Sequence, residues 1–265
     1  MYRIDDLTAF LDGFAPAHLA ETWDNVGLLL GDRRSPVDRV LTCLTLTPDV
    51  AEEAIRERAA FVVTHHPILF RAVKRITADD AQGAMLLALA RANVAVYSPH
   101  TAFDSTSEGI NDRLCAKLEI HGVRPLRPRP ANDTDAAFEG SGRFGERPVA
   151  TDFATFAADV RRAIQLPSID AVSTTRSIKT VAVACGSAAE FLPDAVQAGC
   201  DVLVTGEARF HAALDARTQG IGLVLLGHYA SERFAVEELA DVIAAAFPSL
   251  TVWPSRDERD PLDRF

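Results

Sequence analysis

The stretch Phe61-Val62-Val63-Thr64-His65-His66-Pro67 ends an apolar run on two adjacent histidines, and its construction recurs later in the chain. In each half, an apolar run typical of a strand is followed by a helical pattern and then by a second apolar run. That order is typical of a βαβ unit with parallel strands. The sequence predicts these elements at 40–46, 48–60 and 61–64 in the first half, and at 181–185, 188–199 and 202–205 in the second.

Polar side chains follow the predicted strands at matching positions in both units. Each lies just past an apolar run, where open α/β sheets bind their ligands. They are His65, His66, His100 and Asp104 in the first unit, and Glu207, His228 and Glu232 in the second. We therefore expect a three-layer α/β protein whose two similar lobes face each other across a metal-binding cleft.

The donor types in this set favour a transition-metal ion. Imidazole and carboxylate together suit zinc, manganese, iron or cobalt better than calcium. The set would serve one or two ions, and no single spacing within it is diagnostic.

Each donor also has a structural alternative. The paired histidines could bond backbone carbonyls at a strand end, and neighbouring strand residues point to opposite faces unless the strand has ended. Pro67 favours an ending before the histidines, because proline cannot continue a β-ladder. Asp104 and Glu232 could be helix caps, although Ser107 is the better placed N-cap after Asp104.

The composition argues against a nucleic-acid or membrane partner. The 265 residues carry a net charge of −10 with a pI near 5.2, whereas nucleic-acid binding needs clustered Lys and Arg. The densest basic run, 124–129, alternates with proline and is predicted to be a solvated linker. No run reaches the roughly 20 apolar residues of a membrane span, and the start lacks the apolar core of a signal peptide.

The cysteines predict a reducing compartment. Cys43, Cys115, Cys185 and Cys200 are scattered along the chain and form no CxxC pair. Most lie in or beside apolar runs, which favours buried reduced thiols over disulfides. We therefore expect a cytoplasmic protein.

Shifts in composition predict two lobes, of which the first is discontinuous. An amphipathic helix is expected at 4–14. The stretch 123–148, rich in Pro, Arg, Asn and Gly, breaks the apolar periodicity, and there the chain is expected to leave the first lobe. A helix at 230–247 returns to that lobe, and 255–265 is predicted to be a surface tail. The predicted lobes are 1–122 with 223–265, which binds the metal, and 123–222.

Six motifs, taken in order, resemble one known family. They are Trp23-Asp24-Asn25-Val26-Gly27-Leu28, Thr64-His65-His66-Pro67, Ser98-Pro99-His100-Thr101 with Asp104, Gly109-Ile110-Asn111-Asp112, Thr205-Gly206-Glu207 and Gly227-His228-Tyr229-Ala230-Ser231-Glu232. Together they resemble the dinuclear metal centre hexameric protein family, whose members are often named GTP cyclohydrolase 1 type 2 homologues. The resemblance runs from about residue 4 to residue 247.

The resemblance implies a two-lobed α/β protein that holds two divalent metal ions per chain and assembles as a toroidal homo-hexamer. Carried over motif by motif, the implied ligands are His65 and His66, the bridging carboxylate Asp104, and His228 with Glu232. Further positions that line the same cleft in the family match His100, Asn25, Glu207 and His211.

The chain departs from the family pattern around the implied ligands and not at them. Ala102-Phe103 stands before Asp104, and Phe210-His211 replaces a common pair of histidines. These departures affect the shape of the substrate pocket. Glu207 and His211 have i, i+4 spacing, which would place both on one helical face or leave them as a surface pair.

Two functions of different classes are compatible with these residues. In the first, a metal-dependent hydrolase of the GTP cyclohydrolase type acts through a metal-bound hydroxide on a small, nucleotide-like substrate. His100 or Glu207 then moves protons as a general acid or base. In the second, the chain is a non-catalytic metal-binding or scaffold hexamer. Open coordination positions would favour the hydrolase, and ligand shells closed by protein atoms would favour the scaffold.

Overall fold

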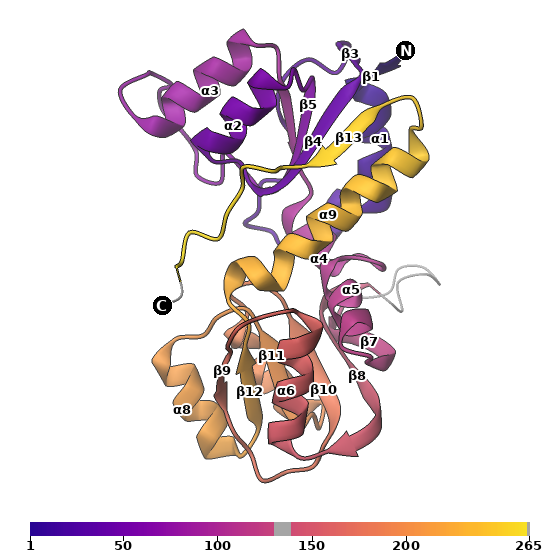
Figure 1. Cartoon of the computed structure of the whole chain (residues 1–265), viewed down its shortest axis with the longest axis vertical. Helices are drawn as coiled ribbons and strands as arrows, with labels where there is room; N and C mark the ends of the chain where they lie inside the picture. Colours follow the sequence, from indigo (N-terminus) through magenta and orange to yellow (C-terminus); the bar gives the residue numbers. More distant parts are fainter. Residues whose placement is uncertain (130–138, 264–265) are drawn as a thin grey trace. The chain divides into compact units, whose positions relative to one another are not determined.

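The computed structural model describes residues 1–129 and 139–263 of the chain (Figure 1). The chain folds into two compact units. Unit 1 consists of Met1–Phe103 with Arg233–Phe265, and unit 2 is Asp104–Glu232. The mixed α/β fold is confirmed, and within the described residues no helix is both long and apolar enough to cross a membrane.

Unit 1 is built on a five-stranded sheet in the order β13-β4-β5-β6-β2. The first four strands are parallel, and β2 is antiparallel at the edge. A short antiparallel pair, β1 with β3, lies outside this sheet. The strands are β1 (Tyr2–Arg3), β2 (Gly27–Leu30), β3 (Pro36–Val37), β4 (Arg39–Thr45), β5 (Phe61–His66), β6 (Ala95–Ser98) and β13 (Thr251–Pro254).

Helices cover both faces of this sheet, with α2 and α3 on one face and α1 with α9 on the other (Figure 1). The helices of unit 1 are α1 (Ile4–Phe14), η1 (Ala17–Leu19), α2 (Pro48–Arg56) and α3 (Ala81–Arg91), joined by the start of α4 (His100–Ser105) and by α9 (His228–Ala246) from Arg233 onward. The prediction of a helix at 4–14 is confirmed, and Ile4, Leu7 and Leu11 are buried along it. Leu41 and Cys43 of β4 lie in a core with residues of α2 and α3.

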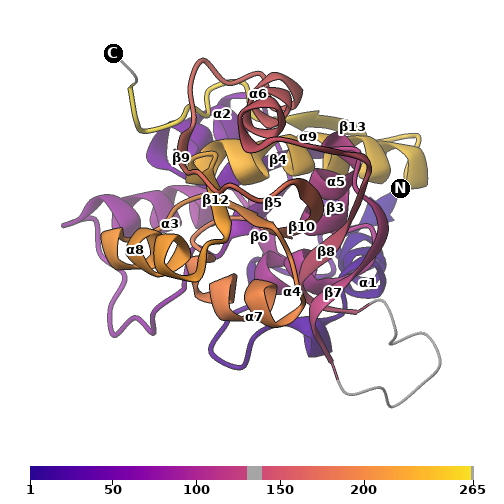
Figure 2. The ribbon, with the colours of Figure 1, turned by 90° about the horizontal axis from the view of Figure 1, so that it is seen from below.

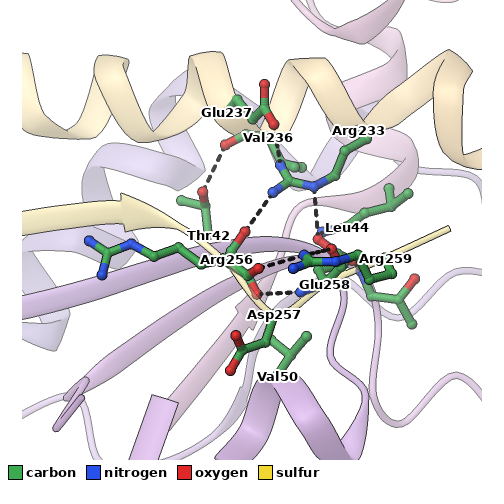
Figure 3. A network of polar contacts seen from close by, with 12 residues as sticks. Thr42, Leu44, Val50, Arg233, Val236, Glu237, Arg256, Asp257, Glu258 and Arg259 are labelled. Atoms are coloured by element: carbon green, nitrogen blue, oxygen red, sulfur yellow. Dashed lines mark hydrogen bonds and ion pairs between the residues drawn. The ribbon is translucent and has the colours of Figure 1, made fainter. Parts of the chain in front are cut away.

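The C-terminal segment is anchored in unit 1, so the prediction of a surface tail at 255–265 is wrong for its first part. Ser255 is 4% exposed and Glu258 is 5% exposed. The Glu258 carboxylate accepts hydrogen bonds from the backbone N–H groups of Leu44 and Thr45 and pairs with Arg233 (Figure 3). The sequence did not predict this burial, because the anchoring residues are charged and charged residues are rarely buried unless they are paired.

Unit 2 is built on a six-stranded sheet in the order β7-β8-β10-β11-β12-β9. Its central strands β10, β11 and β12 are parallel, and the flanking strands are antiparallel. The strands are β7 (His121–Pro128), β8 (Gly140–Thr151), β9 (Asp170–Val172), β10 (Ile178–Ala184), β11 (Val202–Thr205) and β12 (Gly222–Leu225). The basic run at 124–129, predicted to be a linker, thus lies largely in β7; residues 130–138 of the stretch 123–148 lie outside the described residues.

Helices α6 and α7 lie on opposite sides of this sheet (Figure 2). The helical segments of unit 2 are α5 (Ile110–Lys117), α6 (Phe153–Ala163), η3 (Ala189–Phe191), α7 (Leu192–Gln197) and α8 (Phe210–Gln219), together with the parts of α4 and α9 that fall in this unit. The compact units change inside α4 and α9, and α5 of unit 2 packs against β7, β8 and β10.

The two predicted βαβ units are present with the same internal register. In unit 1 Cys43 pairs with Thr64, and in unit 2 Ala184 pairs with Thr205, each pair being 21 residues apart. Ala184 is therefore the counterpart of Cys43. Predicted bounds shift by a few residues, most of all for the helix at 48–60, which ends at Arg56. The helix predicted at 188–199 is a 3-10 turn followed by the short α7.

All four cysteines are buried and free, as predicted. Burial is the largest influence on their thiols, and it raises the pKa of Cys200 to about 12. Thiols held in the neutral form are unreactive. They are small core residues here.

Candidate metal centre

Three histidines of unit 1 gather at the carboxyl ends of β5 and β6. His65 and His66 are the last residues of β5, and His100 opens α4 just after β6. One ring nitrogen from each of the three lies within 4.8 Å of the others. The imidazole rings of His65 and His66 are 5.1 Å apart between centroids, and His65 is 1% exposed. The prediction that the strand ends at Thr64 is wrong by two residues, although it does end before Pro67.

Hydrogen bonds from neighbouring strands fix this group. Thr45 pairs with His66 across β4 and β5, and its hydroxyl lies 2.7 Å from His66 Nδ1. Ser98, at the end of β6, donates to the backbone carbonyl of His65 at 2.6 Å. The adjoining parallel strands therefore hold both histidines from either side.

His100 is held by a carboxylate from the loop before β2. Its Nδ1 lies 2.7 Å from Asp24 Oδ1, and the Asp24 side chain is fully buried. Burial raises the pKa of Asp24, but hydrogen bonds from His100 and Thr101 outweigh it and leave that pKa at about 2. His100 has a φ of 29°, a strained conformation for a residue with a side chain, and such residues cluster at functional sites.

In unit 2, Asp104 is tied to the end of β10. The amide side chain of Asn111 donates to the Asp104 carbonyl at 3.0 Å and accepts from the Cys185 N–H at 2.9 Å. The Cys185 thiol lies 3.5 Å from Asp104 Oδ1. Asp104 lies within α4, and the next helix, α5, has Gly109 and not Ser107 as its N-cap.

His228 stands between two carboxylates of unit 2. Its Nε2 lies 3.1 Å from Glu232 one helical turn later in α9, and its Nδ1 lies 3.0 Å from Glu207, which follows β11. The hydrogen bond to Glu232 is the largest cause that raises the pKa of His228 to about 9, and burial acts against it. Glu232 is 3% exposed.

Two glycines leave the space that the side chains of Glu232 and Ser231 occupy. Gly186 follows β10 with a φ of +66°, and a Cβ at this position would overlap with Glu232 Oε1. A Cβ at Gly206 would overlap with Ser231 Oγ, which itself accepts from the Gly186 N–H at 3.0 Å. Because both positions are glycine, the start of α9 can approach the backbone of the loops that follow β10 and β11.

These residues fit a divalent transition-metal ion. Unit 1 offers three clustered imidazoles, and unit 2 offers an imidazole in contact with a buried carboxylate at the glycine-lined strand ends. Clustered imidazole is the preferred environment of zinc, iron or cobalt. A buried carboxylate with an imidazole neighbour is suited to remain charged beside a cation.

The remaining predicted positions have different outcomes. Asn25 donates from its side chain to the Leu69 carbonyl at 2.7 Å, which ties two loops of unit 1 together. Glu207 precedes α8 and contacts His228, so it does not share a helical face with His211. His211 is exposed, with its ring next to that of Phe210.

Four further residues were not predicted as site residues, although each contacts a histidine or the glycine loops. They are Asp24, Thr45, Ser98 and Ser231. Asp24, Ser98 and Ser231 stand inside the motifs that carry the family resemblance, which is the one available signal for them. Thr45 follows only from the strand register.

The fold and these side chains define a class of protein: mixed α/β chains that carry imidazole and carboxylate donors at the ends of their strands. The chain belongs to the Duf34/NIF3 (NGG1p interacting factor 3) family, whose model matches residues 2–261. This confirms the resemblance found in the sequence.

Similar proteins agree over nearly the whole chain. A GTP cyclohydrolase 1 type 2 homolog of Clostridium acetobutylicum is 32% identical over 231 residues, which cover 87% of this chain and 85% of that protein. A GTP cyclohydrolase 1 type 2 of Helicobacter pylori is 28% identical and covers 92% of both. The crystal structure of Staphylococcus aureus protein SA1388 superposes with a TM-score of 0.90 at 26% identity, covering 100% of this chain and 99% of that one.

Proposed function

We propose that this protein is a metal-dependent hydrolase that acts on a small, nucleotide-like substrate. The observation that carries the proposal is the cluster of His65, His66 and His100, whose ring nitrogens lie within 4.8 Å of one another. The names of the relatives support the reaction type, since two of them are named for GTP cyclohydrolase.

The ligands that we assign to two divalent ions, zinc, manganese, iron or cobalt, are His65, His66, Asp104, His228 and Glu232. A divalent ion supplies a Lewis acid that lowers the pKa of a water molecule towards neutrality.

The hydrogen bonds at Nδ1 indicate which ring nitrogen binds. His66 meets the Thr45 hydroxyl at this atom, and His228 meets Glu207. In metal sites the second ring nitrogen of a histidine ligand is usually hydrogen-bonded to an oxygen, which fixes the tautomer and the ring orientation. We therefore assign Nε2 of His66 and of His228 to the metal, and we assign to Glu207 the orientation of His228.

His100 is the residue that we assign to proton transfer. Because Asp24 is ionised and bonded to Nδ1, His100 carries its proton on that nitrogen when neutral. Its Nε2 can then accept a proton, and the Asp24 charge stabilises the resulting imidazolium. The arrangement is that of a general base with a carboxylate that orients it.

Elemental analysis by mass spectrometry on purified protein tests the metal assignment. We expect about two transition-metal ions per chain in the wild type, and a loss in the Asp104→Ala and His228→Ala variants. His121→Ala is the matched control, because His121 is an exposed histidine of β7. No metal in the wild type, or an equal loss in the control, would overturn the ligand assignment.

Turnover of GTP by the metal-loaded protein tests the reaction. We expect activity that disappears with chelation and in His100→Ala. Bound metal without turnover of GTP or other nucleotides would overturn the hydrolase and favour a non-catalytic metal-binding or scaffold protein. We also propose the homo-hexamer that the resemblance implies, for which light scattering should give six times the 28.6 kDa chain mass.

A further inference from the structure

Two large aromatic side chains of unit 1 are exposed beside the histidine cluster. Trp23 is 59% exposed and Phe70 is 50% exposed. Their rings meet edge to face at 5.8 Å, and each lies about as far from the imidazole of His100, at 6.1 Å and 6.2 Å. Exposed aromatic side chains that gather at one place commonly mark a binding site.

The two loops that carry these rings are held in place by polar anchors. Trp23 directly precedes Asp24, whose buried carboxylate bonds to His100. Phe70 directly follows Leu69, whose carbonyl accepts from the Asn25 side chain at 2.7 Å. Each exposed ring thus stands directly beside a residue that is anchored by a hydrogen bond. A preordered surface of this kind loses little entropy when it binds a ligand.

The loop that follows Phe70 is basic in an otherwise acidic protein. Arg71, Lys74 and Arg75 are exposed and stand in a run, 70–76, that has no acidic residue. The whole chain carries a net charge of −10. Cations beside exposed aromatic rings match a ligand that has both a planar ring and negative charge.

The position of these rings connects them to the metal ligands. The His100 ring that borders Trp23 and Phe70 is 5.2 Å from His65 and 5.7 Å from His66. A planar ring stacked on the face of Trp23, with Phe70 beside it, would therefore lie one imidazole away from the predicted metal ligands.

We propose that Trp23 and Phe70 form a stacking platform for the heterocyclic base of a mononucleotide, and that Arg71, Lys74 and Arg75 attract its phosphates. This inference rests on the proposed function for the identity of the site, and it adds the residues that recognise the substrate. A polynucleotide is a different ligand, and the charge of −10 argues against it.

Tryptophan fluorescence reports on the platform directly. The chain has two tryptophans, and Trp253 is 6% exposed whereas Trp23 is 59% exposed. A stacked base should quench Trp23. We expect GTP and guanosine to quench the wild type, ribose 5-phosphate to have no effect, and Trp23→Phe to remove most of the quenching.

Affinity measured by calorimetry separates the parts of the platform. Loss of a stacking partner for one base should weaken binding about 5–150-fold, and we expect Trp23→Ala and Phe70→Ala each to weaken GTP binding within that range. The triple variant Arg71→Gln, Lys74→Gln, Arg75→Gln should weaken GTP binding but not guanosine binding, and should lower its salt dependence. Val149→Ala, an exposed apolar side chain of β8, is the control that should bind GTP like the wild type.

Binding is measured with and without metal, so that the two proposals fail separately. Quenching by guanosine, together with no nucleotide turnover by the metal-loaded protein, would support the platform and overturn the hydrolase. GTP binding that is unchanged in Trp23→Ala and Phe70→Ala would overturn the platform and leave the hydrolase standing. No quenching by any nucleotide, or tighter binding of an oligonucleotide than of GTP, would also overturn the platform.

Discussion

Replacing Glu258 with alanine should destabilise unit 1 strongly and disturb the histidine cluster. The Glu258 carboxylate is buried and accepts from the backbone N–H groups of Leu44 at 2.9 Å and Thr45 at 2.6 Å. It also lies 3.1 Å from Arg233, whose guanidinium is itself largely buried (Figure 3). Alanine would leave two N–H groups and one guanidinium without this acceptor.

The expected loss follows from those contacts. Removing one partner of a buried ion pair typically costs about 3–5 kcal/mol, because the other charge remains in the interior. Both side chains are at most 10% exposed, so little of this is screened by solvent. For a chain of this size, 1 kcal/mol corresponds to roughly 2–4 °C. The melting temperature should therefore fall by roughly 6–20 °C.

Truncation gives the sharpest assay, since Glu258 lies close to the C-terminus. Differential scanning calorimetry is run on a chain that ends at residue 259, which keeps Glu258, and on one that ends at residue 257, which lacks it. The double variant Arg233→Met, Glu258→Leu should recover part of the loss by removing both charges. Equal melting temperatures for the two truncations, or a double variant less stable than Glu258→Ala, would refute the reasoning.

Three further predictions concern single contacts. Burial raises the pKa of Glu53, but hydrogen bonds from Ser255, Arg256, Asp257 and Trp253 lower that pKa overall. The contribution of Glu53 to stability is therefore present above the unfolded pKa of about 4.3 and is lost as pH falls through the folded pKa. In urea titrations, Glu53→Gln should lose less stability than the wild type between pH 5 and pH 3. Gly186→Ala should reduce the bound metal measured by mass spectrometry, because its Cβ would displace Glu232, whereas Gly199→Ala, with a similar φ of +74° but nothing within 4 Å, should strain the backbone and keep the metal. Thr45→Val should weaken metal binding about 10–100-fold by removing the hydroxyl at His66 Nδ1, and Thr45→Ser should restore it; equal affinity in all three proteins would contradict the role of the hydroxyl.

The sequence predicted the elements whose signal is local. The strand at 202–205 and the helix at 4–14 have the expected bounds, because each is a continuous periodic pattern that ends in recognisable stop residues. The sequence predicts the strand of the two histidines two residues too short, because Pro67 ends it after His66 and not before His65. The anchored tail was missed because Glu258 meets Leu44 across more than two hundred residues.

The side chains that bond to the histidines explain why the tautomers of these histidines are harder to predict than their presence at the site. A histidine at a strand end is visible in the sequence, but its tautomer depends on the atom that faces Nδ1. For His66 that atom comes from Thr45, which the β4–β5 register places alongside, and for His100 it comes from Asp24 in a loop 76 residues earlier. A hydroxyl can accept or donate, whereas an ionised carboxylate can only accept. Asp24 therefore fixes the proton of His100 on Nδ1, and Thr45 leaves that of His66 open to adjustment when a metal binds. The position of each ring proton therefore depends on a side chain that is distant in the sequence, which no local pattern reveals.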